Sequence, residues 1–329
     1  MAVVGVGAFG RNHARVYHEI AQQDPGVEFV GVVDANLARA KDIARQFGAQ
    51  AFASVSQLKG VVDAATVAVP TVHHLEVAQQ LMRDGIDVLV EKPIAPSLPE
   101  ADELIKLARQ HQRVAQAGHL ERFNPAVRAT TKLITKPMFF EVHRLSVFTP
   151  RSLDVDVVLD LMIHDLDIVL SFVDSPVKEV RAVGLPILSD KVDIANVRME
   201  FDSGCVANFT ASRVSTERIR KLRFFQPHQY VSLDYTRQDV VVFTVSDGQA
   251  AAAPGLAELD AAHPSGPEIR PFKPEVTHEE PLHAELRAFL SAVQGRSKPA
   301  VTLEEGRRAL SVALDILETI RVHTRKIGM

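Results

Sequence analysis

The chain reads MAVVGVGAFG over residues 1–10 and VVDANLARA over residues 32–40. In the first stretch a short apolar run leads into Gly5, Gly7 and Gly10, which have the spacing G-x-G-x-x-G, and an amphipathic segment follows. A strand, a glycine turn and a helix in this order are typical of the first crossing of a doubly wound parallel sheet. The sequence therefore predicts that the chain begins with an α/β domain.

The glycines of this turn have separate roles. Gly5 permits a tight bend, Gly7 lets backbone N–H groups approach a pyrophosphate, and Gly10 lets the helix pack closely on the strand. Ala8 and Phe9 lie at the start of the helix, whose N-terminus favours negative charge. We expect this turn to bind the diphosphate of a dinucleotide.

Asp34 follows the second apolar run, 24 residues after Gly10. A carboxylate at this point accepts hydrogen bonds from the adenosine ribose and repels a 2′-phosphate, so NAD is favoured as the cofactor over NADP. Arg39 is the nearest basic residue and keeps NADP possible. The alternative is a glycine-rich turn with a capping aspartate, which the regular order of strands and helices disfavours.

Apolar runs alternate with amphipathic segments as far as residue 118. The predicted strands are 2–6, 29–33, 64–69, 88–90 and 114–117, and the predicted helices are 11–21, 37–47, 73–83 and 99–111. This alternation indicates parallel strands crossed by helices. We assign residues 1–120 to a Rossmann domain that binds NAD.

Residues 121–329 show a different pattern, which predicts an α+β domain for substrate binding and catalysis. Helices are expected at 124–134, 157–172, 282–293 and 303–325, and strands at 138–148, 177–188, 192–201, 205–214, 221–225, 229–235 and 240–245. These strands suit a large, mostly antiparallel sheet, and we expect its open face to form a homodimer or homotetramer. Residues 246–280 are rich in Ala, Pro and Gly, and we expect them to be poorly ordered rather than functional.

Composition excludes several classes of protein. With 37 Lys and Arg against 41 Asp and Glu the net charge is -4, so nothing across the whole sequence favours binding to nucleic acid. Cys205 is the single cysteine, so no internal disulfide can form. No apolar run reaches the roughly 18 to 20 residues that span a bilayer. We expect a cytoplasmic protein of about two domains that acts on a small molecule.

Two further strand ends border the expected cofactor cleft. Val69, Pro70, Thr71 and nearby His74 follow the strand over 64–69. Ligands of doubly wound sheets bind at the carboxyl ends of strands, which predicts that these residues lie beside the nicotinamide. His74 could equally begin a surface helix.

Glu91, Lys92 and Pro93 follow the strand over 88–90. A lysine beside the nicotinamide and the substrate would stabilise a developing alkoxide. Pro93 limits the conformations of Lys92. A solvated lysine after a strand is the alternative, and the tripeptide alone does not decide between them.

Asp160, His164 and Asp167 interrupt an otherwise apolar helical segment. Spacings of four and three residues place them on one stripe of the helix. Histidine is the side chain best suited to remove a hydroxyl proton near neutral pH, and a neighbouring carboxylate can orient it. His164 could instead be a core histidine, or ligate a metal with Asp160, but no third ligand with clear spacing is present. We prefer the role of a base.

Together, the glycine turn, the Glu91-Lys92-Pro93 turn and the Asp160-x-x-x-His164-x-x-Asp167 helix resemble the Gfo/Idh/MocA oxidoreductase family over essentially the whole chain. The resemblance implies hydride transfer between a sugar or cyclitol carbon and the nicotinamide. It also implies catalytic roles for three residues: His164 takes the hydroxyl proton, Lys92 steadies the oxygen, and Asp160 positions the substrate or His164.

Residues 118–125 and 212–225 resemble a narrower branch, which oxidises the 3-hydroxyl of UDP-N-acetylglucosamine or a related UDP-sugar. The residues expected to contact the substrate are His119, Arg122, Asn124, Asp167, Arg213, Arg218 and Lys221. With Arg220, the last three form a basic cluster suited to a diphosphate. The cluster could instead be a solvated strand edge, and Arg122 and Asn124 could cap a helix. The rival functions are an inositol or free-sugar dehydrogenase and a dinucleotide sensor without turnover.

Overall fold

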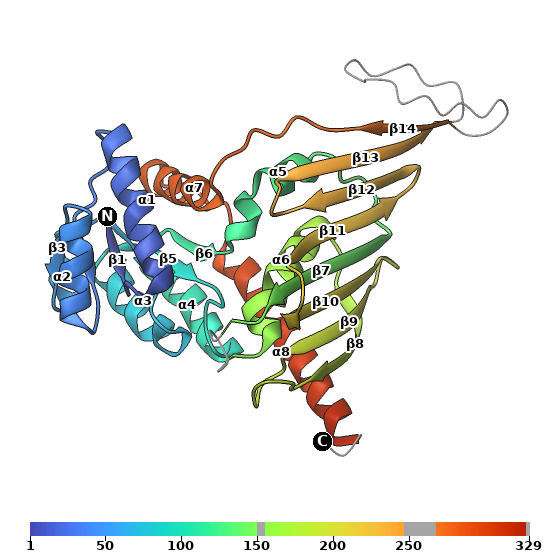
Figure 1. The fold of residues 1–329 in the computed structure, drawn as a ribbon. Coiled ribbons are helices and arrows are strands. Elements are labelled where there is room, and N and C mark those ends of the chain that lie inside the picture. Colours follow the sequence, from blue (N-terminus) through green and yellow to red (C-terminus); the bar gives the residue numbers. More distant parts are fainter. Residues whose placement is uncertain (150–154, 247–267, 327–329) are drawn as a thin grey trace. The chain divides into compact units, whose positions relative to one another are not determined.

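A six-stranded parallel sheet forms the centre of the first of two units in the computed structural model, which describes residues 1–149, 155–246 and 268–326 (Figure 1). Its strand order is β3-β2-β1-β4-β5-β6, the order of a Rossmann fold. The strands are β1 (Ala2–Val4), β2 (Gly31–Val33), β3 (Gln50–Phe52), β4 (Ala64–Val67), β5 (Asp87–Glu91) and β6 (Ala115–Gly118). The predicted doubly wound sheet is confirmed. The short strand β3 was not predicted, because only Phe52 of its three residues is buried.

The first unit also contains helices and short helical turns, most of which connect these strands. They are α1 (Ala8–Gln23), α2 (Leu37–Gln46), α3 (His74–Arg83), α4 (Leu98–Gln110) and α7 (Pro281–Gly295), the first part of α8 (Leu303–Lys326), and the short turns η1 (Val55–Leu58), η2 (Thr71–His73) and η3 (Leu120–Phe123). Tyr17 and Ile20 of α1 share a buried cluster with Leu286 and Phe289 of α7. Helices α1 and α7 therefore pack together over Leu89 of the sheet.

The unit boundaries differ from the expected split at residue 120. The first unit consists of Met1–Phe123 and Glu279–Ser311, and the second of Asn124–His278 and Val312–Met329. We expected all the C-terminal helices in the second domain, but α7 buries its apolar face against α1. Thr302 also forms a bridge with Gln116 of β6. Sequence order hides the packing of α7 on α1, because these two helices are more than 250 residues apart in the chain.

The second unit contains an eight-stranded sheet in the order β14-β13-β12-β11-β7-β10-β9-β8. Its strands are β7 (Phe139–Val147), β8 (Val177–Leu185), β9 (Ile194–Phe201), β10 (Val206–Ser215), β11 (Ile219–Gln226), β12 (Gln229–Asp234), β13 (Asp239–Ser246) and β14 (Glu268–Phe272). Only β7 and β10 pair in parallel, so the predicted mostly antiparallel sheet is confirmed. Strand β14 was not predicted. The expectation of poor order over 246–280 falls mainly on residues 247–267, which lie outside the described residues.

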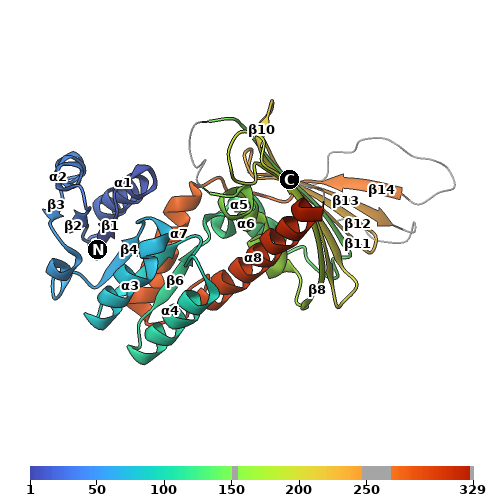
Figure 2. The ribbon, with the colours of Figure 1, turned by 90° about the horizontal axis from the view of Figure 1, so that it is seen from below.

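Helices cover one face of this sheet, as Figure 2 shows. They are α5 (Pro125–Thr131), the π-helical turn η4 (Val158–Met162) and α6 (Ile163–Phe172). Phe172 of α6 packs beside Phe140 and Phe224, with ring centroids 6.4 Å away in each case. Side chains alternate between the two faces of a strand. The covered face is therefore that of Phe140 and Phe224, and their chain neighbours lie on the open face. Within the described residues, no helix combines the length and the apolar character needed to cross a membrane.

Candidate active site

The glycine turn between β1 and α1 has the geometry expected for binding a diphosphate. Gly5 has φ 87°, which favours glycine, and a Cβ on Gly10 would lie 1.8 Å from the Gly5 carbonyl oxygen. A Cβ on Gly7 would meet no atom within 4 Å. Gly5 and Gly10 are thus needed for the turn itself, whereas the space beside Gly7 is open to a ligand.

Asp34 lies at the carboxyl end of β2, beside this turn. Its Oδ2 accepts a hydrogen bond from the Val6 N–H at 2.9 Å, and its Oδ1 accepts one from the Asn36 N–H at 2.8 Å and one from Arg39 at 3.0 Å. Burial alone raises the pKa of a carboxyl, but these donors outweigh it and hold the pKa of Asp34 below its ordinary value. The carboxylate is ionised and keeps acceptor capacity for a ribose hydroxyl.

The residues after β4 include a buried histidine. Val69, Pro70 and Thr71 lie at the carboxyl end of the strand, as predicted. His74 is 1% exposed, and its two ring nitrogens lie 2.9 Å from the Val69 carbonyl oxygen and 3.0 Å from that of Pro93. Burial lowers the pKa of His74, although both carbonyls act in the opposite direction. His74 therefore joins two loops at the end of β4, and it is also the first residue of α3. Its contact with the cofactor stays a prediction.

Glu91 ends β5 and is tied to helix α1. Its Oε1 lies 2.9 Å from Nε2 of His13, which is fully buried, and its Oε2 accepts a 3.3 Å hydrogen bond from the Lys92 N–H. A Cβ on Gly118 would lie 3.0 Å from the Glu91 carboxyl, so a larger residue there would crowd this side chain. The turn that carries Lys92 is thus fixed through Glu91. Sequence reasoning missed His13, whose only signal is its place on the buried stripe of α1 with Tyr17.

A second buried carboxyl lies near Glu91. Glu285 of α7 is fully buried, and neither of its oxygens has a hydrogen-bond partner within the described residues. Burial, with the nearby Glu91 carboxylate, raises the pKa of Glu285 well above its ordinary value. Burial also raises the pKa of Tyr17, whose hydroxyl lies 2.8 Å from that of Thr66. The environment of Glu285 therefore favours the protonated carboxyl over the carboxylate.

The predicted substrate residues near position 120 are mostly buried. His119 is 1% exposed, and Arg122 in η3 forms an ion pair with Glu305 at 3.2 Å. Asn124 in the second unit caps α5, because its Oδ1 accepts a hydrogen bond from the Ala126 N–H at 3.1 Å. The capping role considered for Asn124 is thus present.

The predicted catalytic helix of the second unit begins with a π-helical turn. Asp160 lies in this turn and His164 in the first turn of α6, and both are partly exposed. Asp167, predicted on the same stripe, is 2% exposed. π-helical turns are frequent at functional sites. The turn was not predicted, since apolar spacing does not distinguish it from an ordinary α-helical turn.

The residues of the basic cluster predicted on β10 and β11 differ in burial and in the face of the sheet on which they lie. Arg213 is buried, lies 3.2 Å from Asp193, and donates to the carbonyls of Val155 and Val192. Arg218 is exposed in the turn before β11. Lys221 lies on the open face, opposite Asp234, and its side chain is 42% exposed.

Arg220, the fourth member of the predicted basic cluster, lies on the face covered by α6. It is paired across the sheet with Arg144 and alternates with Leu222 and Phe224. Lys221 therefore lies on the side of the sheet opposite α6. Neighbouring residues of a strand point to opposite faces, so the two adjacent members of the basic cluster lie on different sides of the sheet.

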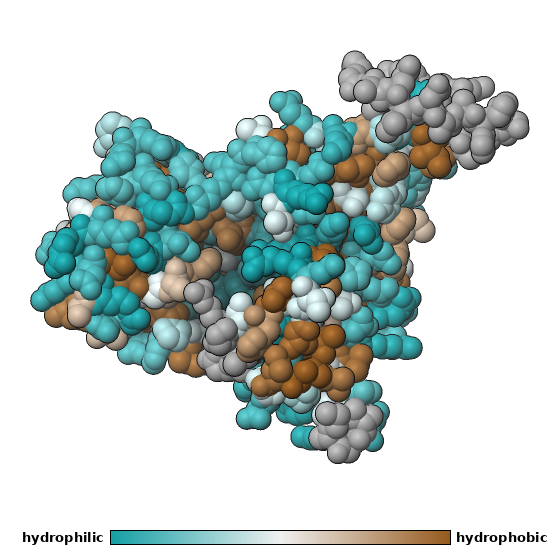
Figure 3. All heavy atoms as spheres, in the orientation of Figure 1, coloured by the Kyte–Doolittle hydropathy of each residue, from teal (hydrophilic) through white to brown (hydrophobic). Residues whose placement is uncertain are grey.

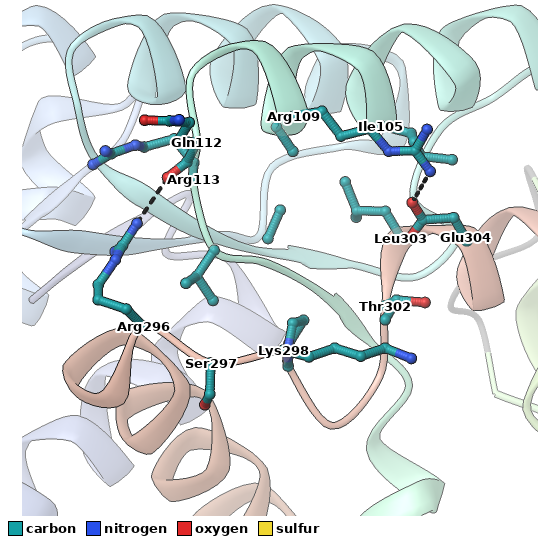
Figure 4. Close-up of a pocket in the computed structure, with 14 residues that line it drawn as sticks. Ile105, Arg109, Gln112, Arg113, Arg296, Ser297, Lys298, Thr302, Leu303 and Glu304 are labelled. Atoms are coloured by element: carbon teal, nitrogen blue, oxygen red, sulfur yellow. Dashed lines mark hydrogen bonds and ion pairs between the residues drawn. The ribbon is translucent and has the colours of Figure 1, made fainter.

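A separate cavity of about 620 Å³ lies in the first unit (Figure 4). It is at the amino end of β6, which begins at Ala115, whereas the glycine turn follows the carboxyl end of β1. Arg109 at its rim forms an ion pair with Glu304 at 2.7 Å, and Arg296 donates to the Gln112 carbonyl at 2.7 Å. Because the strands of this sheet are parallel, the cavity lies at the amino ends of the strands and the glycine turn lies at their carboxyl ends.

Comparisons with known proteins identify the family. A profile described as an oxidoreductase family with an NAD-binding Rossmann fold matches residues 1–119, and the C-terminal domain profile of the Gfo/Idh/MocA family matches residues 138–226. UDP-N-acetylglucosamine 3-dehydrogenase from Acidithiobacillus ferrooxidans is 35% identical over 95% of both chains. This chain belongs to the Gfo/Idh/MocA oxidoreductase family. The predicted family is confirmed.

Other relatives agree with this Gfo/Idh/MocA membership. A solved structure of the Acidithiobacillus ferrooxidans UDP-N-acetylglucosamine 3-dehydrogenase has a TM-score of 0.87 and 34% identity, and the match covers 98% of this chain and 97% of that one. The scyllo-inositol 2-dehydrogenase of Bacillus subtilis is 28% identical over 65% of this chain and 67% of its own. This Gfo/Idh/MocA protein is thus an NAD-binding oxidoreductase that acts on CH–OH groups, as predicted.

The residues of this Gfo/Idh/MocA chain fit NAD. The turn leaves open space beside Gly7, and Asp34 is an ionised acceptor where a ribose would lie. Bound NAD supplies a hydride acceptor. Lys92 belongs to the first unit, together with the glycine turn and Asp34, whereas Asp160 and His164 belong to the second.

Proposed function

We propose that this enzyme oxidises the 3-hydroxyl of UDP-N-acetylglucosamine, or of a closely related UDP-sugar, with NAD. The observation that carries this proposal is the 35% identity with a UDP-N-acetylglucosamine 3-dehydrogenase over 95% of both chains. The inositol dehydrogenase relative matches only 65% of the chain. A nucleotide-sugar is therefore the favoured substrate class, and a free sugar or inositol is the second.

The roles of the catalytic residues follow from their chemistry. His164 accepts the proton of the substrate hydroxyl, because an imidazole has the proton affinity suited to this step near neutral pH. The Lys92 ammonium stabilises negative charge on the same oxygen as the hydride leaves the carbon. Asp160, partly exposed in the π-helical turn, orients the substrate or the His164 ring. The dinucleotide is held by the glycine turn and Asp34.

We assign the contact with the UDP diphosphate to Arg220 in place of Lys221. Arg220 lies on the same sheet face as the helix that carries His164, whereas Lys221 lies on the open face. Guanidinium groups bind phosphate oxygens in pairs. Arg220→Met is expected to raise the KM for the UDP-sugar about tenfold or more, while the matched Lys221→Met leaves it within about twofold. Equal effects of the two variants would contradict this assignment.

A turnover assay tests the proposed substrate. Purified protein and NAD are mixed with UDP-N-acetylglucosamine, its uronic acid form, N-acetylglucosamine or myo-inositol, and NADH absorbance is followed. We expect turnover with a UDP-sugar and at least about 100-fold lower kcat/KM without the UDP group, since a diphosphate contact of several kcal/mol is lost. Turnover with inositol alone would refute the UDP-sugar proposal. Binding of NAD without turnover on any substrate would favour the sensor.

We further propose that the open sheet face joins two or four copies in the cytoplasm, where NAD and nucleotide-sugars are available. A row of aromatic side chains crosses this face, with ring centroids 5.0–5.7 Å apart. The row consists of Phe139, Phe225, Tyr230 and Phe243. Phe225 and Phe243 of this row are 39% and 36% exposed, and exposed aromatic rows favour association. The side of the molecule drawn in Figure 3 is mostly hydrophilic, with hydrophobic residues gathered in a patch at its lower centre. Light scattering of wild type and Phe225→Asp tests this, and a monomeric wild type would contradict it.

A further inference from the structure

A buried ion pair joins the centre of the large sheet to the helix that carries His164. Arg144 of β7 donates from Nε to Oδ2 of Asp165 at 2.6 Å and from Nη2 to Oδ1 at 2.9 Å. The two side chains are only 3% and 2% exposed. The Arg144 guanidinium also stacks on the Tyr235 ring, 5.0 Å from its centroid. The pair is bidentate, buried and covered by an aromatic ring.

Its position relates it directly to the proposed base. Asp165 follows His164 in the first turn of α6, immediately after the π-helical turn that contains Asp160. Arg144 lies on β7, which has β10 and β11 as its two neighbours and is therefore an interior strand of the sheet. From Met162 to Leu170 every side chain except His164 is buried. The pair thus fixes the buried side of the turn whose open side presents His164.

A second buried pair holds the start of the same segment. Arg213 contacts Asp193 at 3.2 Å and donates to the Val155 carbonyl, and Asp156 accepts a hydrogen bond from the Val192 N–H at 2.9 Å. The π-helical turn therefore lies between two attachments. Of the two, only Arg144–Asp165 is adjacent in sequence to His164.

Stability alone does not account for such a pair. Burial of two charges costs desolvation energy that their attraction barely repays, and well-packed apolar residues often serve equally well. A bidentate guanidinium–carboxylate contact, however, allows one geometry only. The Arg144–Asp165 pair also places two charges next in sequence to His164, which must gain and lose a proton if it acts as the base.

We propose that Arg144 and Asp165 are positioning residues for His164, which fix the place of its ring and balance the charge beside it. The inference rests on the proposed role of His164 as the base. Other charged groups surround the same segment, on its own turns and on the covered face of the sheet. They are Asp156, Asp160, Asp167, Asp193, Arg213 and Arg220. All of them stay constant in the variants below.

The test separates charge from position with two variants. Asp165→Asn leaves the Arg144 charge without its partner, and arginine cannot release its proton. The protonated His164 ring is then disfavoured, so its titration midpoint falls by about 0.5 to 1 pH unit. The double variant Arg144→Met/Asp165→Asn removes both charges and returns the midpoint to within about 0.2 unit of wild type. NMR of ¹³Cε1-labelled histidine measures the midpoint, and the signal is identified by its loss in His164→Gln.

Turnover supplies the second readout. Both variants are expected to lower kcat about tenfold or more with the KM for the UDP-sugar within about threefold and NADH binding unchanged, since position is lost in both. Asp87→Asn in the first unit is the matched control, because Asp87 is also a buried partner of an arginine and its side chain is 3% exposed. It should leave the His164 midpoint unchanged. Arg144→Lys keeps the charge but not the bidentate contact, so it should lower kcat with no shift of the midpoint.

Two results would overturn the proposal. One is equal His164 midpoints in wild type and Asp165→Asn, and the other is a double variant that stays as far shifted as Asp165→Asn. If Asp165→Asn does not fold, Arg144→Lys decides through kcat and KM, and a wild-type kcat in that folded variant contradicts positioning. Absence of UDP-sugar turnover in wild type would refute the proposed function alone, because the NMR titration still tests the pair.

Discussion

Lys92 and His164, the two residues proposed to act on the substrate hydroxyl, are supported by different chemistry. The turn of Lys92 is held by two buried histidines: His74 lies between two carbonyls, and His13 contacts Glu91. The turn of His164 is held by a bidentate pair of Arg144 and Asp165.

The difference has a consequence for pH dependence. A guanidinium keeps its charge at every pH at which a protein is folded, whereas an imidazole in an apolar environment changes protonation near neutral pH. We therefore expect the support of Lys92 to weaken in acid and that of His164 to persist. The pH dependence of turnover would then arise mainly from the contacts that support Lys92.

The largest effect is expected at His164. His164→Ala should lower kcat about 100-fold or more, the usual loss on removal of a general base, while NADH binding survives. His143→Ala is the control, because His143 lies on the open sheet face, paired with Lys221. Steady-state kinetics with a UDP-sugar and NADH fluorescence measure both quantities. Unchanged turnover in His164→Ala would remove this residue from the mechanism.

A smaller effect is expected from a substitution at the cofactor site, at Asp34. Asp34→Ala should reduce the preference for NAD over NADP about tenfold, because the carboxylate no longer repels a 2′-phosphate and Arg39 loses its ion-pair partner. The ratio of kcat/KM for the two cofactors measures the preference. Arg39→Ala is the matched variant and should weaken use of NADP alone. A ratio unaltered in Asp34→Ala would place cofactor discrimination elsewhere.

His74 tests the acid sensitivity of the Lys92 side. Its pKa is below the ordinary value of 6.5, so between these two pKa values the unfolded chain binds a proton that the native protein does not. Stability thus falls as pH drops through that window. His74→Gln should flatten the dependence of Tm on pH below about 6.5 and lower kcat a few-fold. The partly exposed His18→Gln is the control, and an equal slope in wild type and His74→Gln would contradict this account.

The smallest effect is expected at Glu285, and it has the opposite sign. Its pKa is raised, so the native protein holds a proton that the unfolded chain releases above about pH 4.5, and stability falls as pH rises from there toward the native pKa. Glu285→Gln keeps the neutral shape and should raise Tm by a few degrees at pH 8, with little change at pH 5. The exposed Glu76→Gln should raise Tm at neither pH. A Tm lower than wild type at pH 8 would show that Glu285 acts as a carboxylate.

The motifs and both sheets could be predicted because local patterns specify them. Gly5, Gly7 and Gly10 are read from spacing, and alternating apolar runs give the strands. Asp160 and His164 could be found because polar residues stand out in an apolar helix. Each of these signals lies within about 20 residues of sequence.

The remaining errors arise from information that local sequence lacks. Which of Arg220 and Lys221 lies on the face covered by α6 depends on the pairing of β11 with β7. The contact of Glu91 with His13 joins residues far apart in the chain. Arg144 is inconspicuous in a strand, and only packing of α6 on that strand shows its partner. Assignment of α7 to the first unit likewise needs tertiary contacts.

Isotope transfer tests the central claim most directly. UDP-N-acetylglucosamine that carries deuterium at C3 of the sugar is incubated with the enzyme and NAD, and the NADH is analysed by mass spectrometry. The account predicts deuterated NADH from this substrate and unlabelled NADH from substrate deuterated at C4. Label that arrives from C4 only, or no NADH from either substrate, would contradict it.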